Sequence, residues 1–261
     1  MIGVFDSGLG GLSVLAAISR ALPGADLLYL ADTAHLPYGA KSDDFIRGRV
    51  LAIGRHLANC GCSTVVVACN TATAAALRAL REQNSEIAVV GVEPGVKPAA
   101  ASSLSRRIAV LATESTAKSA GLARLIRDHR GEVAVHVEAC PGWATRIEKL
   151  DLNDPALASE VSAKILPLLE AGMDRLVLGC THYSFLAPLL EPLIIGRAEL
   201  VDVAAAVARQ VVRLSGESTG SDGSLKLLAT AKPERLLAAL PALGLGWLAA
   251  RVSAPAQLAD I

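Results

Sequence analysis

The sequence predicts an α/β protein made of two similar parallel-sheet lobes of the flavodoxin-like class. Short β-branched apolar runs alternate with helical stretches along most of the chain, a pattern typical of parallel sheets covered by helices. The motif at residues 65–71 ends an apolar run at Cys69, and residues 176–182 repeat this pattern at Cys180. The first strands expected in the two halves lie about as far apart as these cysteines. We therefore expect two copies of one unit, related by pseudo-twofold symmetry.

In the first half, each strand is predicted from a short apolar run, and the four runs are residues 1–5, 27–30, 64–68 and 87–92. Helical periodicity between these runs predicts three helices, at residues 9–22, 43–59 and 72–83. Ser42 is the expected N-cap of the second helix.

The second half repeats the alternation, with strands expected at residues 108–112, 133–137, 175–179, 200–201 and 225–228. One helix is expected to run to about residue 130, and a short one to carry Arg146 and Glu148. Another begins at Pro155 with Asp154 as its cap. Further helices are expected at residues 184–193, 203–214 and 233–240. Residues 94–98 are interpreted as a connection and residues 215–223 as a polar linker.

Composition excludes several classes of protein. Hydrophobic residues make up 52% of the 261 residues, which is too many for a disordered chain. Lys+Arg and Asp+Glu both number 25, so no basic surplus indicates a nucleic-acid partner. No apolar stretch reaches the ~18 residues of a membrane span. With no basic, apolar leader before the first strand, we expect a cytoplasmic protein and five reduced cysteines.

Cys69 and Cys180 differ from the other three cysteines in their position. Each is expected to end a strand and open a helix, where amide N–H groups and the helix dipole favour a thiolate. Cys60, Cys62 and Cys140 are interpreted as core residues, since cysteine is among the most often buried residues.

Two thiols in one site can form a disulfide, bind a metal ion or flank a substrate carbon. A metal ion needs more ligands than His182 alone would add. Redox pairs usually lie close together in sequence. The third possibility fits best: a thiolate removes a proton from one face of a carbon and a thiol returns one to the other face. Such a reaction inverts the centre without a cofactor.

Each thiol has a candidate helper. Asp6, at the end of the first strand, can take up a substrate proton or tune Cys69, although capping the next helix is an alternative role. His182 follows Cys180 by two residues, and its ordinary pKa of ~6.5 suits it to tuning that thiol. Glu148 either neutralises a substrate ammonium group or is a solvated helix residue.

Binding of a substrate carboxylate calls for N–H donors and hydroxyl groups. Helix starts supply both, at Ser7, Asn70, Thr71, Thr116 and Thr181. Taken singly, each hydroxyl is better explained as a helix cap, so the prediction depends on their convergence. The loop of Pro37, Tyr38 and Gly39 either places backbone amides on a second carboxylate or is a plain turn.

A glycine-rich stretch at residues 8–11 also allows a nucleotide-binding interpretation, with Asp32 as a ribose-binding acid. Ser13 replaces the third glycine of the dinucleotide fingerprint, and Asp6 would oppose a pyrophosphate. A nucleotide-dependent oxidoreductase therefore remains a minor alternative.

Together these motifs resemble glutamate racemase. The segments that carry the resemblance are residues 5–12, 32–39, 68–71, 91–99 and 179–183. It implies a cofactor-independent racemase, without a metal ion, that makes D-glutamate for peptidoglycan in the bacterial cytoplasm. It also implies a discontinuous first lobe of residues 1–93 plus 204–261, a second lobe of residues 94–203, and a site in the cleft between them. The implied partner is L- or D-glutamate, not nucleic acid or membrane, and homodimers are common in the family.

The resemblance also implies a role for each site residue. Cys69 would exchange the proton of D-glutamate with Asp6 as its helper, and Cys180 that of L-glutamate with His182. Substrate contacts would fall on Ser7, Pro37, Tyr38, Gly39, Asn70, Thr71, Thr116, Glu148 and Thr181. Two alternatives stay open from the sequence: a related two-cysteine racemase acting on aspartate or a hydantoin, and a non-catalytic amino-acid-binding module.

Overall fold

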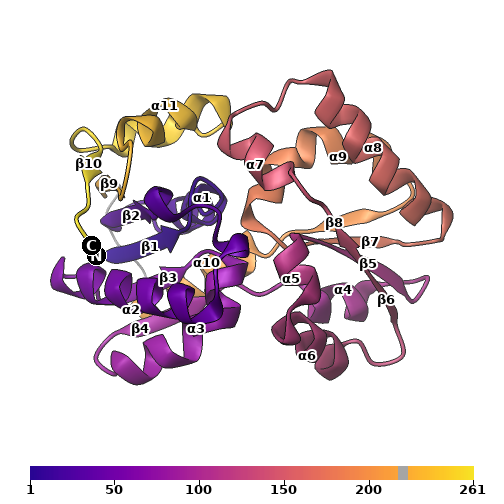
Figure 1. Cartoon of the computed structure of the whole chain (residues 1–261), viewed down its shortest axis with the longest axis horizontal. Helices are drawn as coiled ribbons and strands as arrows, with labels where there is room; N and C mark the ends of the chain where they lie inside the picture. The colour runs from indigo at the N-terminus through magenta and orange to yellow at the C-terminus, as the bar shows by residue number, and fades with distance from the viewer. Residues whose placement is uncertain (217–222) are drawn as a thin grey trace. The chain divides into compact units, whose positions relative to one another are not determined.

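The computed structural model describes residues 1–216 and 223–261, which form two compact units. The first unit comprises Met1–Val92 and Ala204–Ile261, and the second comprises Glu93–Val203. Each unit holds a parallel sheet with helices packed on it (Figure 1), which confirms the predicted fold class. The expected linker at residues 215–223 lies mostly outside the described residues.

In the described part of the first unit, the sheet has six parallel strands in the order β10-β9-β2-β1-β3-β4. These strands are β1 (Ile2–Asp6), β2 (Leu27–Ala31), β3 (Thr64–Val67), β4 (Ala88–Gly91), β9 (Leu225–Ala229) and β10 (Gln257–Leu258). The central strands β1, β2 and β3 are buried along their whole length, because helices cover both faces. This burial explains their continuous apolar sequences.

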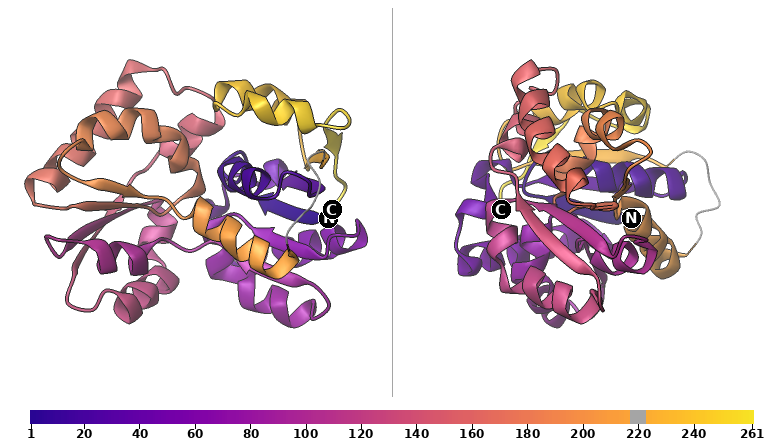
Figure 2. Two further views of the ribbon diagram at one scale, coloured as in Figure 1. Left: turned by 180° about the vertical axis from the view of Figure 1, so that it is seen from behind. Right: turned by 90° about the vertical axis from the view of Figure 1, so that its right-hand side faces the viewer.

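The helices of the first unit pack in pairs. Helix α1 (Leu12–Ala21) packs on α10 (Ala204–Ser215), and α2 (Asp43–Asn59) packs on α3 (Asn70–Gln83). The Ser42 side chain accepts a hydrogen bond from the Phe45 N–H, which confirms the predicted N-cap of α2. After β9 the chain forms α11 (Glu234–Ala242) and a 3₁₀ segment, η4 (Gly246–Arg251), drawn in yellow in Figures 1 and 2.

In the second unit, four parallel strands have the order β6-β5-β7-β8 among the described residues. They are β5 (Arg107–Ala112), β6 (Ala134–Ala139), β7 (Arg175–Leu178) and β8 (Glu199–Val201). In each unit, the second strand along the chain pairs with the first, the first with the third, and the third with the fourth. The duplication predicted from the two cysteine motifs is therefore present in the strand order.

Helices lie on both faces of the second sheet (Figure 1). Helices α4 (Val96–Ser102) and α6 (Ala120–His129) share an apolar cluster with β5 and β7. Helices α8 (Pro155–Glu170) and α9 (Ala187–Ile194) pack together on the other face. The predicted cap of α8 is confirmed, since the Asp154 carboxylate accepts a hydrogen bond from the Ala156 N–H. Two short helices, α5 (Glu114–Lys118) and α7 (Trp143–Glu148), follow β5 and β6.

Some boundaries differ from the prediction. The segment interpreted as a connection, residues 94–98, enters helix α4, whose first turn tolerates Pro98 because N–H groups there need no helical partner. The single helix expected up to residue 130 is broken at Ser119, which ends α5 and caps α6 through the Leu122 N–H. Strand β10 was not predicted, because it is two exposed residues long and has no apolar run.

Gly179 fixes the spacing of the second sheet just before Cys180. Its N–H donates to the Leu111 carbonyl at 2.8 Å. A Cβ atom at this position would lie 2.7 Å from that same oxygen. Because this oxygen belongs to the backbone of a central strand, the clash has no flexible side chain to relieve it. Only glycine fits without displacing β7 or β5.

We expect the G179A variant to lose about 1–3 kcal/mol of unfolding free energy, as overpacked interiors do. The G48A variant is the matched control, since Gly48 lies in α2 with open space around its position. There alanine should stabilise the helix by about 0.5–1 kcal/mol. Urea denaturation of both variants makes the comparison. Equal stability of G179A and the parent chain would contradict the packing described above.

Candidate active site

The two cysteine motifs occupy equivalent positions in the two units. Cys69 is the N-cap residue of α3, and Cys180 is the N-cap residue of the 3₁₀ segment η3 (Thr181–Leu186). The prediction that each thiol ends its strand is wrong by two residues, because β3 ends at Val67 and β7 ends at Leu178. The chain stays extended through both cysteines. The residue before each cysteine still donates to the neighbouring strand, Ala68 to the Phe5 carbonyl and Gly179 to the Leu111 carbonyl. Each thiol therefore stands beyond the carboxyl edge of its sheet.

The segment after Cys180 also differs from the predicted helix 184–193. It begins as a 3₁₀ segment at Thr181, and the α-helix starts only at Ala187. Pro188, in the first turn of α9, explains this late start, because proline is favoured there and not further inside.

In the first unit, Asp6 and Cys69 are linked through Ser7. Asp6 is fully buried, and its Oδ1 accepts hydrogen bonds from the Gly8 N–H at 2.8 Å and the Ser7 hydroxyl at 3.2 Å. The Ser7 Oγ lies 3.8 Å from the Cys69 Sγ. The alternative role of Asp6 as a cap of α1 is wrong, because Gly11 is the N-cap residue there and no side chain caps it.

The loop after β1 is held close to this carboxylate. The Tyr29 hydroxyl donates to the Gly8 carbonyl at 2.6 Å. A Cβ atom on Gly11 would lie 2.6 Å from the Asp6 Cβ and 3.0 Å from the Tyr29 hydroxyl. Gly11 thus lets the loop pass close to Asp6, a structural role that needs no nucleotide.

Asn70 presents a buried amide at the start of α3. The residue is buried, and its Nδ2 has no hydrogen-bond partner within the part of the chain that the structure describes. A buried donor without a partner costs free energy unless a ligand or water satisfies it. Together with the adjoining helix N–H groups, this amide makes a site suited to an anion such as a carboxylate.

The loop that follows β2 is anchored by Asp32. It contains two 3₁₀ turns, η1 (Thr33–His35) and η2 (Tyr38–Ala40), with a cis peptide between Leu36 and Pro37. The buried Tyr38 hydroxyl donates to the Asp32 Oδ2 at 2.6 Å. Tyr38 also shares an apolar cluster with Cys69. Asp32 therefore sets the position of Tyr38, which belongs to the same apolar cluster as Cys69.

Asp32 is stabilised as a carboxylate. Burial by itself would raise its pKa, but hydrogen bonds from Arg49, Tyr38, His35 and Thr230 lower the pKa to about 2. The Arg49 guanidinium binds both carboxylate oxygens, at 3.0 and 2.9 Å.

In the second unit, His182 lies between Cys180 and Glu148. Its Nδ1 is 3.6 Å from the Cys180 Sγ, and its Nε2 is 2.5 Å from the Glu148 Oε1. Burial favours the neutral imidazole, yet hydrogen bonds to Cys180 and Glu148 outweigh burial and raise the pKa of His182 well above its usual value. A charged imidazolium therefore lies next to the Cys180 sulfur.

Two aromatic residues that the sequence reasoning missed join the elements carrying these groups. Trp143 in α7 and Tyr183 in η3 are fully buried, with ring centroids 5.4 Å apart in an edge-on contact. The Tyr183 hydroxyl donates to the Cys140 carbonyl at 3.1 Å. This contact packs α7, which carries Glu148, against η3, which carries His182. Aromatic residues make up only 3% of the chain, and this scarcity was the signal that could have drawn attention to Trp143 and Tyr183.

Three further predicted contacts lie in the first turns of helices or 3₁₀ segments. Thr116 is buried in α5, where its N–H donates to the Thr113 hydroxyl at 3.3 Å. The Thr113 hydroxyl in turn donates to the Thr116 hydroxyl at 3.0 Å. Thr181 is buried at the start of η3, and Thr71 is half-buried in the first turn of α3.

The other cysteines divide into two kinds. Cys60 is exposed, so its interpretation as a core residue is wrong, because α2 ends there and the chain turns at the surface. Cys62 and Cys140 are buried, as predicted, and burial raises the pKa of their thiols to about 11 and about 12. These two thiols are therefore neutral at physiological pH.

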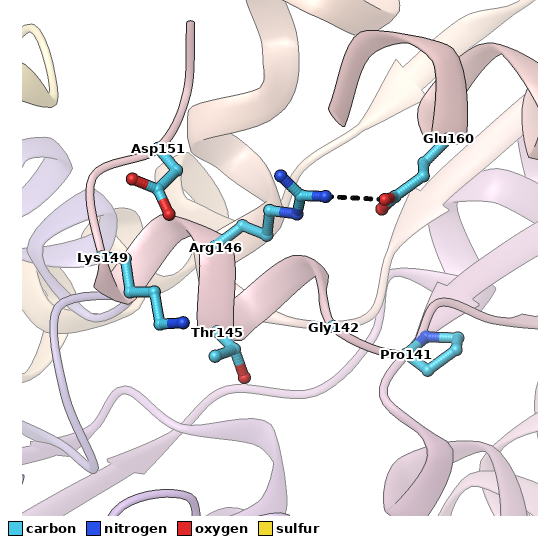
Figure 3. A pocket seen from close by; sticks show the side chains of 7 residues that line it. All are labelled: Pro141, Gly142, Thr145, Arg146, Lys149, Asp151 and Glu160. Carbon is cyan, nitrogen blue, oxygen red and sulfur yellow. Dashed lines mark hydrogen bonds and ion pairs between the residues drawn. The ribbon is translucent and has the colours of Figure 1, made fainter. Parts of the chain in front are cut away.

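A pocket of about 650 Å³ lies in the second unit beside α7 (Figure 3). Its lining contains no predicted site residue, although Arg146 and Glu148 share a helix. Arg146 reaches across it to Glu160, with 2.7 Å between Nη2 and Oε1, and also pairs with Asp154. The lining of this pocket therefore contains none of the thiol and imidazole groups of the predicted site.

Two further findings apply to residues 1–216 and 223–261, the part of the chain that the structure describes. Over these ranges no group of three or more His, Cys, Asp or Glu side chains is placed to hold a metal ion. Within the same ranges no helix combines the length and apolar character needed to cross a membrane.

Comparison with known proteins defines the class. The sequence model of the Asp/Glu/Hydantoin racemase family matches residues 2–211. The chain belongs to this family, and it is an isomerase of the racemase type.

The resemblance to glutamate racemase is confirmed by individual relatives. Glutamate racemase of Ralstonia nicotianae is 48% identical over 246 residues, which cover 93% of this chain and 88% of the relative. The Pseudomonas aeruginosa enzyme of the same name is 45% identical, with 93% of each chain covered.

Solved structures agree. Escherichia coli glutamate racemase, in complex with L-glutamate and the activator UDP-MurNAc-Ala, superposes with a TM-score of 0.85 at 31% identity, covering 100% of this chain and 98% of that one. Aspartate racemase of Picrophilus torridus, at 15% identity and a TM-score of 0.56 over 83% of this chain and 94% of its own, shares the fold.

The low pKa of Asp32 predicts a specific acid dependence of stability. Because folding lowers this pKa from 3.8 to about 2, the carboxylate stabilises the native state above about pH 4, and this contribution is lost as the pH falls toward 2. We expect it to amount to about 2 kcal/mol. Urea unfolding between pH 2 and 5 should show a shallower pH slope for D32N than for the parent chain. Identical slopes would contradict this account of Asp32.

The raised pKa of His182 gives a pH dependence of stability opposite in sign to that of Asp32. The ion pair with Glu148 is present at neutral pH and is lost as the pH rises through the elevated pKa. We expect E148Q to lower that pKa, which NMR titration of the imidazole would show. The control is E138Q, which removes a carboxylate that contacts His136 instead. A His182 titration that does not move in E148Q would contradict the assigned pairing.

Proposed function

We propose that the chain interconverts L- and D-glutamate by proton transfer at the α-carbon, with Cys69 and Cys180 as the acid-base pair. The substrate is inferred from the relatives, since those at 45–48% identity are named glutamate racemase. A further support is the 31% identity to the Escherichia coli enzyme, whose structure holds L-glutamate.

One observation carries the proposal: the first four strands of each unit have the same order, and a thiol lies beyond the third strand in both. Cys69 is linked to Asp6 through the Ser7 hydroxyl, and Cys180 lies beside His182. One such thiol has many explanations, such as simple burial. Two thiols at equivalent positions match the requirement of racemisation, which needs one acid-base group for each face of the carbon. The proposal requires that residues of both units act on a single substrate molecule.

In the proposed reaction, the Cys69 thiolate removes the α-proton of D-glutamate and becomes a thiol. The electron pair stays on the α-carbon, and the Cys180 thiol protonates the opposite face and becomes a thiolate. The product is L-glutamate, and the reverse reaction exchanges the two roles. Each acid-base group of this kind contributes roughly 10²–10⁴-fold to the rate.

The helpers act differently on the two sides. Asp6 influences Cys69 through the Ser7 hydroxyl, and it can also accept a proton from the substrate ammonium group. His182, held in the charged form by Glu148, stabilises the Cys180 thiolate after it has given up its proton. Electrostatic stabilisation of this kind supplies a large part of many enzymatic rate enhancements.

Binding of the substrate follows from the remaining donors. The Asn70 amide, which has no protein partner among the described residues, would donate to the α-carboxylate. The hydroxyls of Ser7, Thr71, Thr116 and Thr181 would supply further donors. Backbone amides of the loop at Pro37, Tyr38 and Gly39 would bind the side-chain carboxylate. No cofactor is needed, and the product D-glutamate would serve peptidoglycan synthesis in the cytoplasm.

The decisive experiment incubates the purified chain with L-glutamate in D₂O without pyridoxal phosphate. We expect deuterium at the α-carbon and decay of optical rotation to zero. C69S and C180S should each lose net racemisation, whereas C60S, which alters an exposed thiol, should keep it. Full activity in either of the first two variants would exclude the two-thiol mechanism.

The same assay with L-aspartate tests the substrate. We expect turnover far below that of glutamate, because a side chain shorter by one methylene cannot reach both carboxylate sites at once. Equal turnover of the two amino acids would overturn the assignment to glutamate.

A further inference from the structure

The C-terminal residues belong to the first unit although the family match ends at residue 211. Strand β9 pairs in register with β2 over its whole length, from Leu27 opposite Leu225 to Ala31 opposite Ala229. Strand β2 leads directly to Asp32 and the loop that carries Tyr38. Residues beyond the match therefore form the strand that pairs with β2, and β2 leads into the loop.

Beyond the paired strands, side chains continue the connection. The Thr230 hydroxyl donates to the Asp32 Oδ1 at 2.8 Å and accepts from the Ala34 N–H at 3.0 Å. The Thr33 hydroxyl donates to the Ala231 carbonyl at 2.5 Å and accepts from the Ala231 N–H at 3.0 Å. Four hydrogen bonds thus fix the beginning of the loop to the C-terminal segment.

Arg49 adds a second connection from helix α2. Its guanidinium binds both oxygens of Asp32 and donates a further hydrogen bond to the Ile261 carbonyl at 2.6 Å. The arginine side chain is 14% exposed and the aspartate side chain 0% exposed, so solvent competes little for these bonds. Two residues of the C-terminal segment are therefore connected to one carboxylate, Thr230 directly and Ile261 through Arg49.

The second oxygen of the Asp32 carboxylate, Oδ2, binds the loop through Tyr38. Asp32 Oδ2 accepts from the Tyr38 hydroxyl at 2.6 Å, and the Tyr38 ring is buried in the cluster that includes Cys69. We propose that residues 223–261 act through Asp32 to position the Tyr38–Gly39 loop, with Asp32, Arg49 and Thr230 as positioning residues for binding of the substrate's side-chain carboxylate. This inference rests on the proposed function, which gives the loop that contact.

The position of the loop determines which kinetic constant should change. The loop would bind the carboxylate remote from the α-carbon, and this contact is the same in the ground state and the transition state. Removal of uniform binding raises KM and leaves kcat unchanged. Because the two glutamate enantiomers are equally stable, any variant changes kcat/KM equally in both directions. The split between KM and kcat is therefore the informative measurement.

The test compares T230V with T230S, which keeps the hydroxyl, and R49M with R47M. Arg47 lies on the same helix and pairs with Asp44 at the surface, so R47M is a matched control. We expect KM to rise about tenfold for both enantiomers in T230V and R49M, as for loss of a hydrogen bond to a charged group, with kcat within about twofold. T230S and R47M should resemble the parent chain.

Hydrogen exchange gives a readout that does not need activity. Amides of residues 33–41 should exchange about tenfold faster in T230V and R49M, and at the parental rate in T230S and R47M. An unchanged KM, or unchanged exchange, in both T230V and R49M would overturn the inference. Absence of racemisation by the parent chain would instead refute the proposed function, and the exchange data would still show whether the C-terminal segment holds the loop.

Discussion

The adjacency of the first and third strands is the constraint on which the rest of the structure depends. In the first unit, β1 and β3 pair in parallel with Val4 opposite Val66, so the residues that follow the two strands emerge at one edge. That edge brings Asp6 and Ser7 to Cys69. In the second unit, β5 and β7 pair in the same way. A change in the strand order of the first unit would separate Cys69 from Asp6 and Ser7.

The first four strands have the same order in both units, but the side chains near the two thiols differ. In the first unit, the acid linked to the thiol through Ser7 comes from the first strand, at Asp6. In the second unit the equivalent strand, β5, leads to the neutral Thr113, and the charged groups come from η3 and α7, at His182 and Glu148. In the proposed mechanism, the two thiols would thus be assisted by different groups, Cys69 by a carboxylate that acts through a hydroxyl and Cys180 by an imidazolium.

Much of this arrangement follows from patterns that act locally. Parallel strands buried on both faces read as continuous apolar runs, so their positions and the cysteine motifs were visible in the sequence. Side-chain caps such as Ser42 and Asp154 were also predictable from their neighbours. The pairing of His182 with Glu148 was not, because it depends on packing between Trp143 and Tyr183 in separate elements. The network at Asp32 was hidden for the same reason, since its partners come from residues up to Ile261.

The placement of β9 has a consequence for biosynthesis. The second unit is a continuous stretch of chain, so all of its residues are available once Val203 has left the ribosome. The first unit needs β9, which pairs with β2 from nearly two hundred residues earlier in the chain. Domains generally fold as units during synthesis, and contacts of long sequence separation form late. The first unit, whose synthesis begins first, is therefore the unit whose sheet is completed last.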